Sequence, residues 1–533
     1  MSRGRPAAAG DLPKLHPTLT RYPFQEDELD PDGKTSAPDR RAFLRRAAGA
    51  VGAAAVVVPL GGRIATGESD PAASGTQSTR TPAAAGPLQQ RRLDGRPPLA
   101  ERCFTSKAVE RTIQRVKHEV TDPKIAQLFE NCFPNTLDTT VDFGEVDGRP
   151  DTFVITGDID AMWLRDSSAQ VWPYLPLMRE DDHLQRLIAG VINRQTRCIL
   201  IDPYANAFYK GPGDSPWKHD LTDMKPQLHE RKWEVDSLCY PIRLAYRYWK
   251  LTADTSPFDD AWRRAMRRVV ATFRTQQRMH GRGPYHFERV TAWQSDTVAG
   301  GGWGNPVRPV GLIVSIFRPS DDATIFPFLV PSNHFAVVSL GQLAEMATAL
   351  GPGADFAAEC RSLAAEVADA LRTYAVVEHP TRGRVWAYEV DGYGSRLFMD
   401  DANVPSLLSL PYLGACAKDD ALYRRTRAFV LSDDDPYWFR GKAASGVGGP
   451  HAGPGRIWPL GLMMQALTST SDDEVAGVLR TLKDTDAGTG FMHEAFDKDD
   501  PSDYTRAWFA WANTLFGELI LTVLHERPHL LKT

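Results

Sequence analysis

The chain has 533 residues and a formal net charge of -5, with 62 basic and 67 acidic residues. This balance lacks the excess of Lys and Arg with which nucleic-acid-binding proteins neutralise phosphates, so it argues against a nucleic-acid partner. The six cysteines form no CxxC pair and no Cys/His cluster at zinc spacing, which argues against a structural metal site. A disulfide between two of them is compatible with an oxidising compartment, but their spacing does not pair them.

The segment 39–60, DRRAFLRRAAGAVGAAAVVVPL, resembles a twin-arginine export signal. Arg40 and Arg41 stand just before two apolar residues, and an Ala/Val run follows. The bland alternative is a chance Arg-Arg pair before a short alanine helix. The run from 47 to 60 is shorter than the roughly 20 apolar residues of a membrane span, so no stable span is expected. We therefore predict that residues 1–60 are a signal region of an exported protein that is secreted or held at the cell surface.

Residues 61–99 are rich in Gly, Ala, Ser, Thr and Pro and show neither helical nor strand periodicity. Such a composition is typical of a disordered spacer. No later segment of this kind follows. We therefore predict a single large globular domain over 100–533.

Within this domain apolar residues recur at helical spacing, whereas two-residue alternation is rare. The windows with helical spacing are 184–200, 237–249, 261–273, 334–350, 355–374, 457–467 and 505–524. Gly/Pro-rich loops dense in acids and aromatics lie between them, as at 300–305, 446–455 and 486–490. Such an array is either a solenoid or a closed double ring of helices, and the lack of a repeat of about 34 or 40 residues favours the ring. The predicted fold class is all-α, with loops that converge at one end to form a pocket.

The stretch TGDIDAMWLRDSSAQVWPYLP, 156–176, places acids and an arginine among indole rings. In isolation Asp158 is explained as a helix N-cap, Trp163 as core, and Arg165 with Asp166 as an exposed ion pair of little energetic weight. Together, however, they are typical of a surface that hydrogen-bonds hydroxyl groups while a ring stacks on an apolar sugar face. The motif therefore predicts a monosaccharide subsite.

This stretch also resembles the hallmark segment of glycoside hydrolase family 125, the metal-independent exo-acting α-1,6-mannosidases. The resemblance continues through KWEVDSLCYP (232–241), FRPSDDATIFPFLVPSNHF (317–335), MDDANVPSLLSLPYL (399–413), GGPHAGPGRIWPLGLMMQALTS (448–469) and TGFMHEAFDKDDPSDYTRAWFAWANTLFGELI (489–520). The blocks keep their order from about residue 105 to the end of the chain. The resemblance implies an (α/α)6 barrel and an inverting mechanism that removes non-reducing terminal α-1,6-linked mannose from a mannose-containing glycan.

An inverting glycosidase needs a protonated carboxyl for the leaving oxygen and an ionised carboxylate that activates water. Asp321 and Asp322 could in isolation be a helix N-cap and a charge that favours the helix dipole. The resemblance at FRPSDDA instead implies that one of them is the acid. We favour Asp321, with Asp322 binding sugar hydroxyls or tuning its neighbour, because adjacent like charges raise one of the two pKa values.

For the base, the resemblance at GFMHEAF implies Glu494, which in isolation would be a solvated helix residue. The acid and the base should lie about 6.5–9.5 Å apart, so that the attacking water fits between them.

The remaining predicted site residues bind the terminal sugar or position the two carboxyl groups. They are Asp158, Trp163, Arg165 and Asp166, and as second choices Arg318, Asn333, Asp401, Asn403 and His451. His451 is equally explained as a hydrogen-bonded structural histidine. Asp236, in an apolar and aromatic setting that would raise its pKa, is an alternative acid and otherwise a sugar-binding or supporting residue.

No cofactor or metal is predicted. The only HxxxH pair, His525 with His529, is separated by Pro528, which breaks the helix that would align the rings. The acid clusters at 400–401 and 497–500 also lack the glycine and the distal Glu of a calcium-binding loop. The alternatives to a mannosidase are another inverting (α/α)6 glycosidase, glucosidase or trehalase-like, a lyase on the same architecture, or an exported sugar-binding protein without catalysis.

Overall fold

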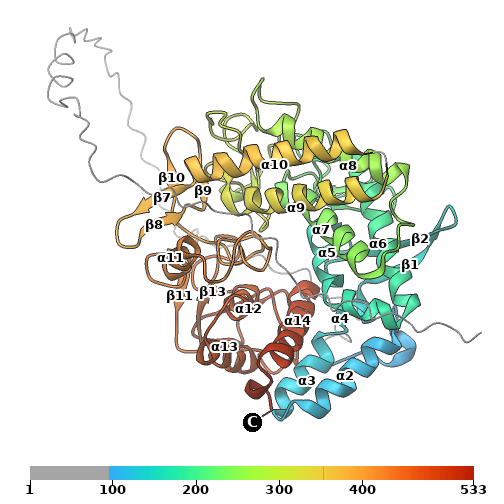
Figure 1. Ribbon diagram of the computed structural model, residues 1–533. Helices are drawn as coiled ribbons and strands as arrows, with labels where there is room; N and C mark the ends of the chain where they lie inside the picture. Colours follow the sequence, from blue (N-terminus) through green and yellow to red (C-terminus); the bar gives the residue numbers. More distant parts are fainter. Residues whose placement is uncertain (1–94, 352, 533) are drawn as a thin grey trace, which may run out of the picture. The chain divides into compact units, whose positions relative to one another are not determined.

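Most of the regular structure in this protein is helical, and short strands lie in many of the segments that connect the helices (Figure 1). The computed structural model describes residues 95–351 and 353–532, all of which fall in one compact unit. The predicted signal region, and the predicted spacer up to residue 94, lie outside the described residues. The predicted domain boundary near residue 100 stays a prediction.

One set of helices is buried on nearly every side. It consists of α5 (Leu164–Val171), α7 (Val235–Thr252), α9 (Val330–Ala349), α12 (Pro459–Leu467) and α14 (Ala510–Glu526). Here α5 packs against α7 and α14, α7 against α9, and α12 against α14 (Figure 1). Helices α12 and α14 are mostly apolar, as is typical of helices in the interior of a large domain. Every residue of α5 is buried although several of them are polar, so its polar side chains need partners inside the fold.

A turn-rich segment, 402–415, runs among these inner helices. The Tyr240 hydroxyl of α7 donates to the Val404 carbonyl at 2.9 Å, and the Tyr412 hydroxyl donates to Glu518 of α14 at 2.9 Å. Both bonds satisfy polar groups that the surrounding apolar side chains remove from water. The segment therefore continues the inner layer between α9 and α12 without a regular helix.

A second set of helices covers the first. Its longer members are α2 (Lys107–Glu119), α3 (Pro123–Cys132), α6 (Asp182–Ile201), α8 (Asp260–Gln276), α10 (Ala354–Tyr374), α11 (Ala421–Val430) and α13 (Asp472–Asp484). Shorter helical segments are α4 (Asn135–Thr139), η1 (Leu99–Glu101), η2 (Trp172–Glu180), η3 (Gln294–Asp296) and η4 (Pro528–Leu530). These covering helices pack on inner ones, as α10 does on α9 and α13 on α12.

Helix α8 shows why the outer layer forms where it does. The Asp259 carboxylate caps it by accepting a hydrogen bond from the Trp262 amide, and Trp262, Met266 and Val269 face inward at helical spacing. The intervening arginines, such as Arg267, face solvent. An apolar stripe opposite a charged face is the pattern of a helix that lies on a core.

The strands are short and belong to six small sheets within the described residues. They are β1 (Val141–Val146) with β2 (Arg149–Val154); β3 (Met162–Trp163), β4 (Ala207–Phe208) and β5 (Leu228–Glu230); β6 (Phe328–Leu329), β9 (Glu389–Val390) and β10 (Arg396–Leu397); β7 (Val376–His379) with β8 (Gly383–Trp386); β11 (Trp438–Arg440) with β12 (Ser445–Val447); and β13 (Arg456–Ile457), β14 (Ala495–Asp497) and β15 (Tyr504–Thr505). The neighbouring strands of each sheet are antiparallel. The helix-rich part of the prediction is confirmed, but the all-α part is incomplete. Most of the strands have two or three residues and are too short to show alternation, and burial does not alternate along the six-residue β1 and β2.

All seven predicted helical windows coincide with helices, with boundaries that differ by a few residues. The structure also contains helices that the periodicity did not reveal, such as α3 and α13. Among the described helices none is long and apolar enough to cross a membrane. Five cysteines are free thiols: Cys132, Cys198, Cys239, Cys360 and Cys416.

Candidate active site

Asp321 lies at the tip of a tight loop that projects from the interior. An antiparallel bridge joins Phe317 to Ala323, and the Arg318 amide donates to the Asp322 carbonyl at 2.8 Å. The backbone of Asp321 has φ of 66°, in the left-handed region that side chains other than glycine rarely adopt. Such strain persists where the surrounding structure imposes it, and it is concentrated at functional sites.

Of the two adjacent acids, Asp321 is the accessible one. Its side chain is 24% exposed, whereas that of Asp322 is 5% exposed. Neither residue caps a helix, since α9 begins only at Val330. The N-cap alternative is therefore wrong, and Asp321 is the acid that a ligand can reach.

Three side-chain donors converge on Oδ1 of Asp321. They are Asn206 Nδ2 at 3.1 Å, the Arg165 guanidinium at 3.3 Å and the Trp163 indole at 3.4 Å. Trp163 ends β3 and Arg165 lies in the first turn of α5, while Asn206 directly precedes β4 on the neighbouring strand. Two residues of the opening motif, Trp163 and Arg165, thus contact the candidate acid Asp321.

Opposing effects act on the pKa of Asp321. Burial alone would raise this pKa, but the positive charges of Arg165, Lys232 and His451 and a hydrogen bond with Glu234 hold it well below its usual range. Lys232 also binds the loop directly, because its ammonium group donates to the Asp321 carbonyl at 2.8 Å. The carboxyl group is therefore ionised in the unliganded site.

Glu494 lies in the turn before β14, not in a helix. Its Oε2 accepts a hydrogen bond from the Thr505 hydroxyl at 3.0 Å, and its Oε1 lies 3.4 Å from the Arg506 guanidinium. The β14–β15 pairing places Thr505 and Arg506 beside it. The solvated-helix alternative is wrong, since this carboxylate is buried and held by two partners.

Arg506 connects Glu494 to the opening motif. Its Nε donates to Asp158 Oδ1 at 2.9 Å, and the guanidinium also donates to the Thr156 hydroxyl at 3.2 Å. The backbone of Arg506 has φ of 46°, a second left-handed residue at this site. Asp158 therefore orients the arginine that orients Glu494, which agrees with its predicted positioning role.

Gly157 determines how closely the opening motif approaches the chain before α14. Its φ is 128°, and a Cβ atom there would lie 2.3 Å from the Trp508 carbonyl oxygen. Replacing Gly157 by alanine is expected to destabilise the protein by about 2 kcal/mol and to lower activity, because both segments must separate. Thermal unfolding and initial rates measure the two effects. Gly144→Ala, where a Cβ meets no atom within 4 Å, is the matched control and should leave both unchanged.

His451 is paired with Asp322, the neighbour of Asp321 along the chain. Its Nδ1 is 3.4 Å from Asp322 Oδ1. Burial would lower the pKa of His451, but Asp322, Glu494 and Asp321 together raise it to about 9. The ion pair with Asp322 therefore holds a charged imidazole beside the loop that carries Asp321.

We expect the His451 imidazole to titrate near pH 9 instead of near its ordinary value of 6.5. The folded-state pKa is raised, so the stability from this ion pair is complete below pH 6.5 and is lost as the pH rises through about 9. NMR titration of the ring protons measures the midpoint, and Asp322→Asn should lower it. A midpoint at or below 6.5 in the wild-type protein would contradict the arrangement.

The other predicted residues support these groups to different degrees. Asp166 is buried against Arg165 at 3.6 Å, and burial raises its pKa to about 6 despite that charge. Asp401 accepts a hydrogen bond from the Ser320 hydroxyl at 2.9 Å, which steadies the loop of Asp321. Asn403 donates its amide N–H to Asp401 at 3.1 Å.

Three predictions of sugar contact need correction. Arg318 is buried and forms an ion pair with Glu389 at 2.6 Å, so its guanidinium stabilises the fold instead of contacting a sugar. Asn333 is fully buried, and its side-chain amide forms hydrogen bonds with the backbone of residues 313 and 329. Asp236 is fully buried between Arg165 and Ser332, so it is a supporting residue that no substrate reaches. Burial, which the motif pattern does not reveal, separates these residues from the accessible ones.

Sequence reasoning also missed residues that act here. They are Asn206, Lys232, Glu234, Thr505 and Arg506. All but the first stand inside the quoted blocks KWEVDSLCYP and DYTRAW, so attention to charged residues there would have found them. The first had no sequence signal.

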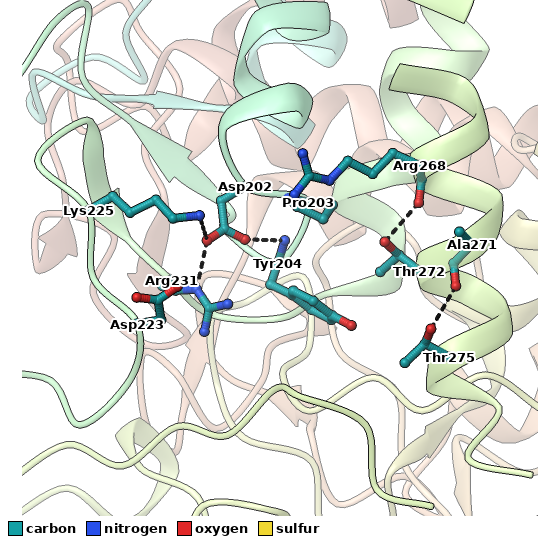
Figure 2. Close-up of a pocket in the computed structure, with 10 residues that line it drawn as sticks. All are labelled: Asp202, Pro203, Tyr204, Asp223, Lys225, Arg231, Arg268, Ala271, Thr272 and Thr275. Atoms are coloured by element: carbon teal, nitrogen blue, oxygen red, sulfur yellow. Dashed lines mark hydrogen bonds and ion pairs between the residues drawn. The ribbon is translucent and has the colours of Figure 1, made fainter. Parts of the chain in front are cut away.

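A cavity of about 260 Å³ is lined by a different set of residues (Figure 2). Among its lining residues Asp202 accepts hydrogen bonds from Lys225 at 2.8 Å and Arg231 at 2.9 Å, so the charges satisfy one another. None of the predicted site residues lines it. Within 95–351 and 353–532, no group of three or more His, Cys, Asp or Glu side chains is placed to hold a metal ion.

Comparison with known proteins identifies the family. The model of the metal-independent alpha-mannosidases (GH125) matches residues 122–521. The meiotically up-regulated gene 157 protein of Schizosaccharomyces pombe is 44% identical over 456 residues, which are 82% of this chain and 89% of that protein. A metal-independent alpha mannosidase from Streptococcus pneumoniae, solved in a non-productive complex with alpha-1,6-mannobiose, is 42% identical, with a TM-score of 0.77 over 80% of this chain and 100% of its own. This chain therefore belongs to glycoside hydrolase family 125, the metal-independent α-mannosidases.

Proposed function

We propose that this protein is an inverting, exo-acting glycoside hydrolase that removes non-reducing terminal α-1,6-linked mannose from glycans. The observation that carries the proposal is the partly exposed Asp321 carboxyl held by three donors, with the buried Glu494 carboxylate held by Thr505 and Arg506. Membership of a mannosidase family supports the sugar, and the mannobiose complex of the streptococcal relative supports the linkage.

In the proposed reaction Asp321 is the general acid and Glu494 the general base. Asp321 gives a proton to the glycosidic oxygen as the bond to the anomeric carbon breaks. Glu494 takes a proton from a water molecule that attacks the opposite face of the sugar, and Arg506 stabilises the negative charge of this carboxylate. For this outcome the two carboxyl groups should lie about 6.5–9.5 Å apart.

We further propose that the fold is an (α/α)6 barrel. The five inner helices and the buried segment 402–415 supply six inner positions, and α3, α6, α8, α10, α11 and α13 cover them. Loops that leave the inner layer carry Asp321, His451 and Glu494. A pocket closed at one end of such a barrel would be a natural site for exo-action.

The first test is the anomer released from α-1,6-mannobiose by the purified protein in EDTA, followed by NMR. Initial appearance of β-mannose is the expected result, because water attacks from the face opposite the leaving group. Initial α-mannose would overturn the inverting mechanism. Release of no mannose would overturn the substrate assignment.

We also propose that the protein is exported through a twin-arginine signal. The support is the sequence alone, in which Arg40 and Arg41 precede Phe43, Leu44 and an alanine-rich run. Replacing both arginines by lysine should retain the protein in the cytoplasm of its native host, as measured by cell fractionation. Unchanged export of the double variant would contradict the proposal.

A further inference from the structure

Glu234, the residue before α7, is a fully buried carboxyl group beside Asp321. One guanidinium contacts both, since Arg165 donates through Nη1 to Glu234 and lies 3.3 Å from Asp321 through Nη2. The two carboxyl groups therefore share one positive charge, and each acts on the pKa of the other. Carboxyl groups this close cannot both be ionised without a large electrostatic cost, so the pair retains a proton.

The hydrogen-bond partners indicate which group carries that proton. Oε2 of Glu234 accepts from Arg165 and from the Ser237 hydroxyl at 2.7 Å, whereas Oε1 is buried and accepts nothing. Oδ1 of Asp321, by contrast, accepts from three donors. A buried carboxyl oxygen without a partner is costly, and a proton on Oε1 removes the defect by donating to Asp321.

The surrounding charges favour the same distribution. Burial raises the pKa of Glu234, and the negative charges of Asp321 and Asp236 add to this effect against the opposing charge of Arg165. The groups that face the pair from the elements around it are Arg165 and Asp166 of α5, His229 of β5, Lys232 before α7, Asp236 of α7, and His451. Asp321 is thus the ionised member and Glu234 the neutral one in the resting site.

We propose that Glu234 stores the proton that Asp321 delivers to the leaving oxygen, which makes Glu234 a positioning residue for the general acid. The inference rests on the proposed function. The O–H bond of Glu234 breaks as one forms on Asp321, and that bond breaks in turn as the proton reaches the glycosidic oxygen and its bond to the anomeric carbon opens. Both carboxylates then face Arg165. Glu494 releases to solvent the proton that it took from the attacking water, and the partly exposed Asp321 takes up a proton from solvent and passes it to Glu234, which restores the pair.

Glu234→Gln tests this, because the amide keeps the shape and can donate to Asp321 but stores no transferable proton. At pH 7 we expect kcat/KM on α-1,6-mannobiose to fall about 100-fold. On 2,4-dinitrophenyl α-mannoside, whose leaving group departs without a proton, the fall should be less than about threefold. Retained activity on this second substrate also reports that the variant folds.

The pH dependence of kcat/KM provides a second test, because it would not shift if Glu234 had a purely structural role. In the wild-type protein the pair keeps its proton up to the raised pKa of Glu234, whereas in Glu234→Gln Asp321 alone must hold it against nearby positive charges. The alkaline limb of kcat/KM on mannobiose should therefore move to lower pH by more than about one unit, with activity recovering as the pH falls. Ser237→Ala removes a donor to the Glu234 carboxylate and should move the limb to higher pH.

Asp236→Asn is the matched control, since Asp236 also contacts Arg165, at 3.5 Å, but not Asp321. Any loss in that variant should fall equally on both substrates. Equal losses on both substrates in Glu234→Gln, or an unmoved alkaline limb in both Glu234→Gln and Ser237→Ala, would overturn the inference. Asp321→Asn distinguishes a failure of this inference from a failure of the proposed function. If Asp321→Asn also keeps its activity on mannobiose, the assignment of Asp321 as the acid is itself wrong.

Discussion

Replacing Glu494 by glutamine should lower kcat on α-1,6-mannobiose by about 1,000-fold. The amide has nearly the same shape and keeps the contact with the Thr505 hydroxyl, but it cannot take a proton from the attacking water. Binding of the disaccharide should survive, so the dissociation constant measured by calorimetry should change by less than about threefold. Stopped and continuous assays of released mannose measure the rate.

Asp500→Asn provides the control for this experiment. Asp500 is an exposed carboxylate in the turn between β14 and β15, so its loss tests a charge change on the same hairpin. This variant should match the wild-type protein in rate and in melting temperature. Normal turnover by Glu494→Gln would remove Glu494 from the reaction, and loss of binding together with turnover would assign it to the substrate subsite instead.

Replacing Asp321 by asparagine should lower kcat/KM on the disaccharide by about 100- to 1,000-fold. The loss should nearly vanish on 2,4-dinitrophenyl α-mannoside, because that leaving group needs no general acid. Asparagine at this position tolerates the left-handed backbone, so the loop at φ of 66° should be preserved. Initial rates on both substrates, measured across pH, give the comparison.

Asp322→Asn decides between the two adjacent acids. Asp322 is buried against His451 and does not face the accessible side, so its replacement should affect both substrates alike. If Asp322→Asn shows the dependence on the leaving group and Asp321→Asn does not, the two roles are reversed. The same pair of variants thus tests the assignment in either direction.

Much of the helical scaffold could be predicted because its signal is local. The window 184–200 became α6 and 355–374 became α10, since a helix that lies on a core repeats its apolar residues every three or four positions. The strands escaped prediction for the opposite reason. A two-residue strand such as β3 is determined by its pairing with β4, which lies more than forty residues later in the chain.

The candidate site divides in the same way. The sequence blocks supplied Asp321, which is partly exposed, and Glu494, which is paired with Arg506. The opening motif supplied Trp163 and Arg165, which contact Asp321. The blocks did not separate a buried supporting residue from one that meets a ligand. Asn333 stands in the same block as Asp321 and yet serves only the backbone of its own surroundings.

The sequence by itself determined the family, the helix-rich fold and the residues from which an acid and a base are drawn, because motif identity and periodicity are properties of neighbouring positions. Only the tertiary structure decided which carboxyl carries a proton and which is ionised. Glu234 and Asp321 lie far apart in the chain and share Arg165, and burial acts oppositely to that charge on each of them. Since pKa values depend on burial and on charges brought together by folding, the chemistry of this site is a property of the folded chain.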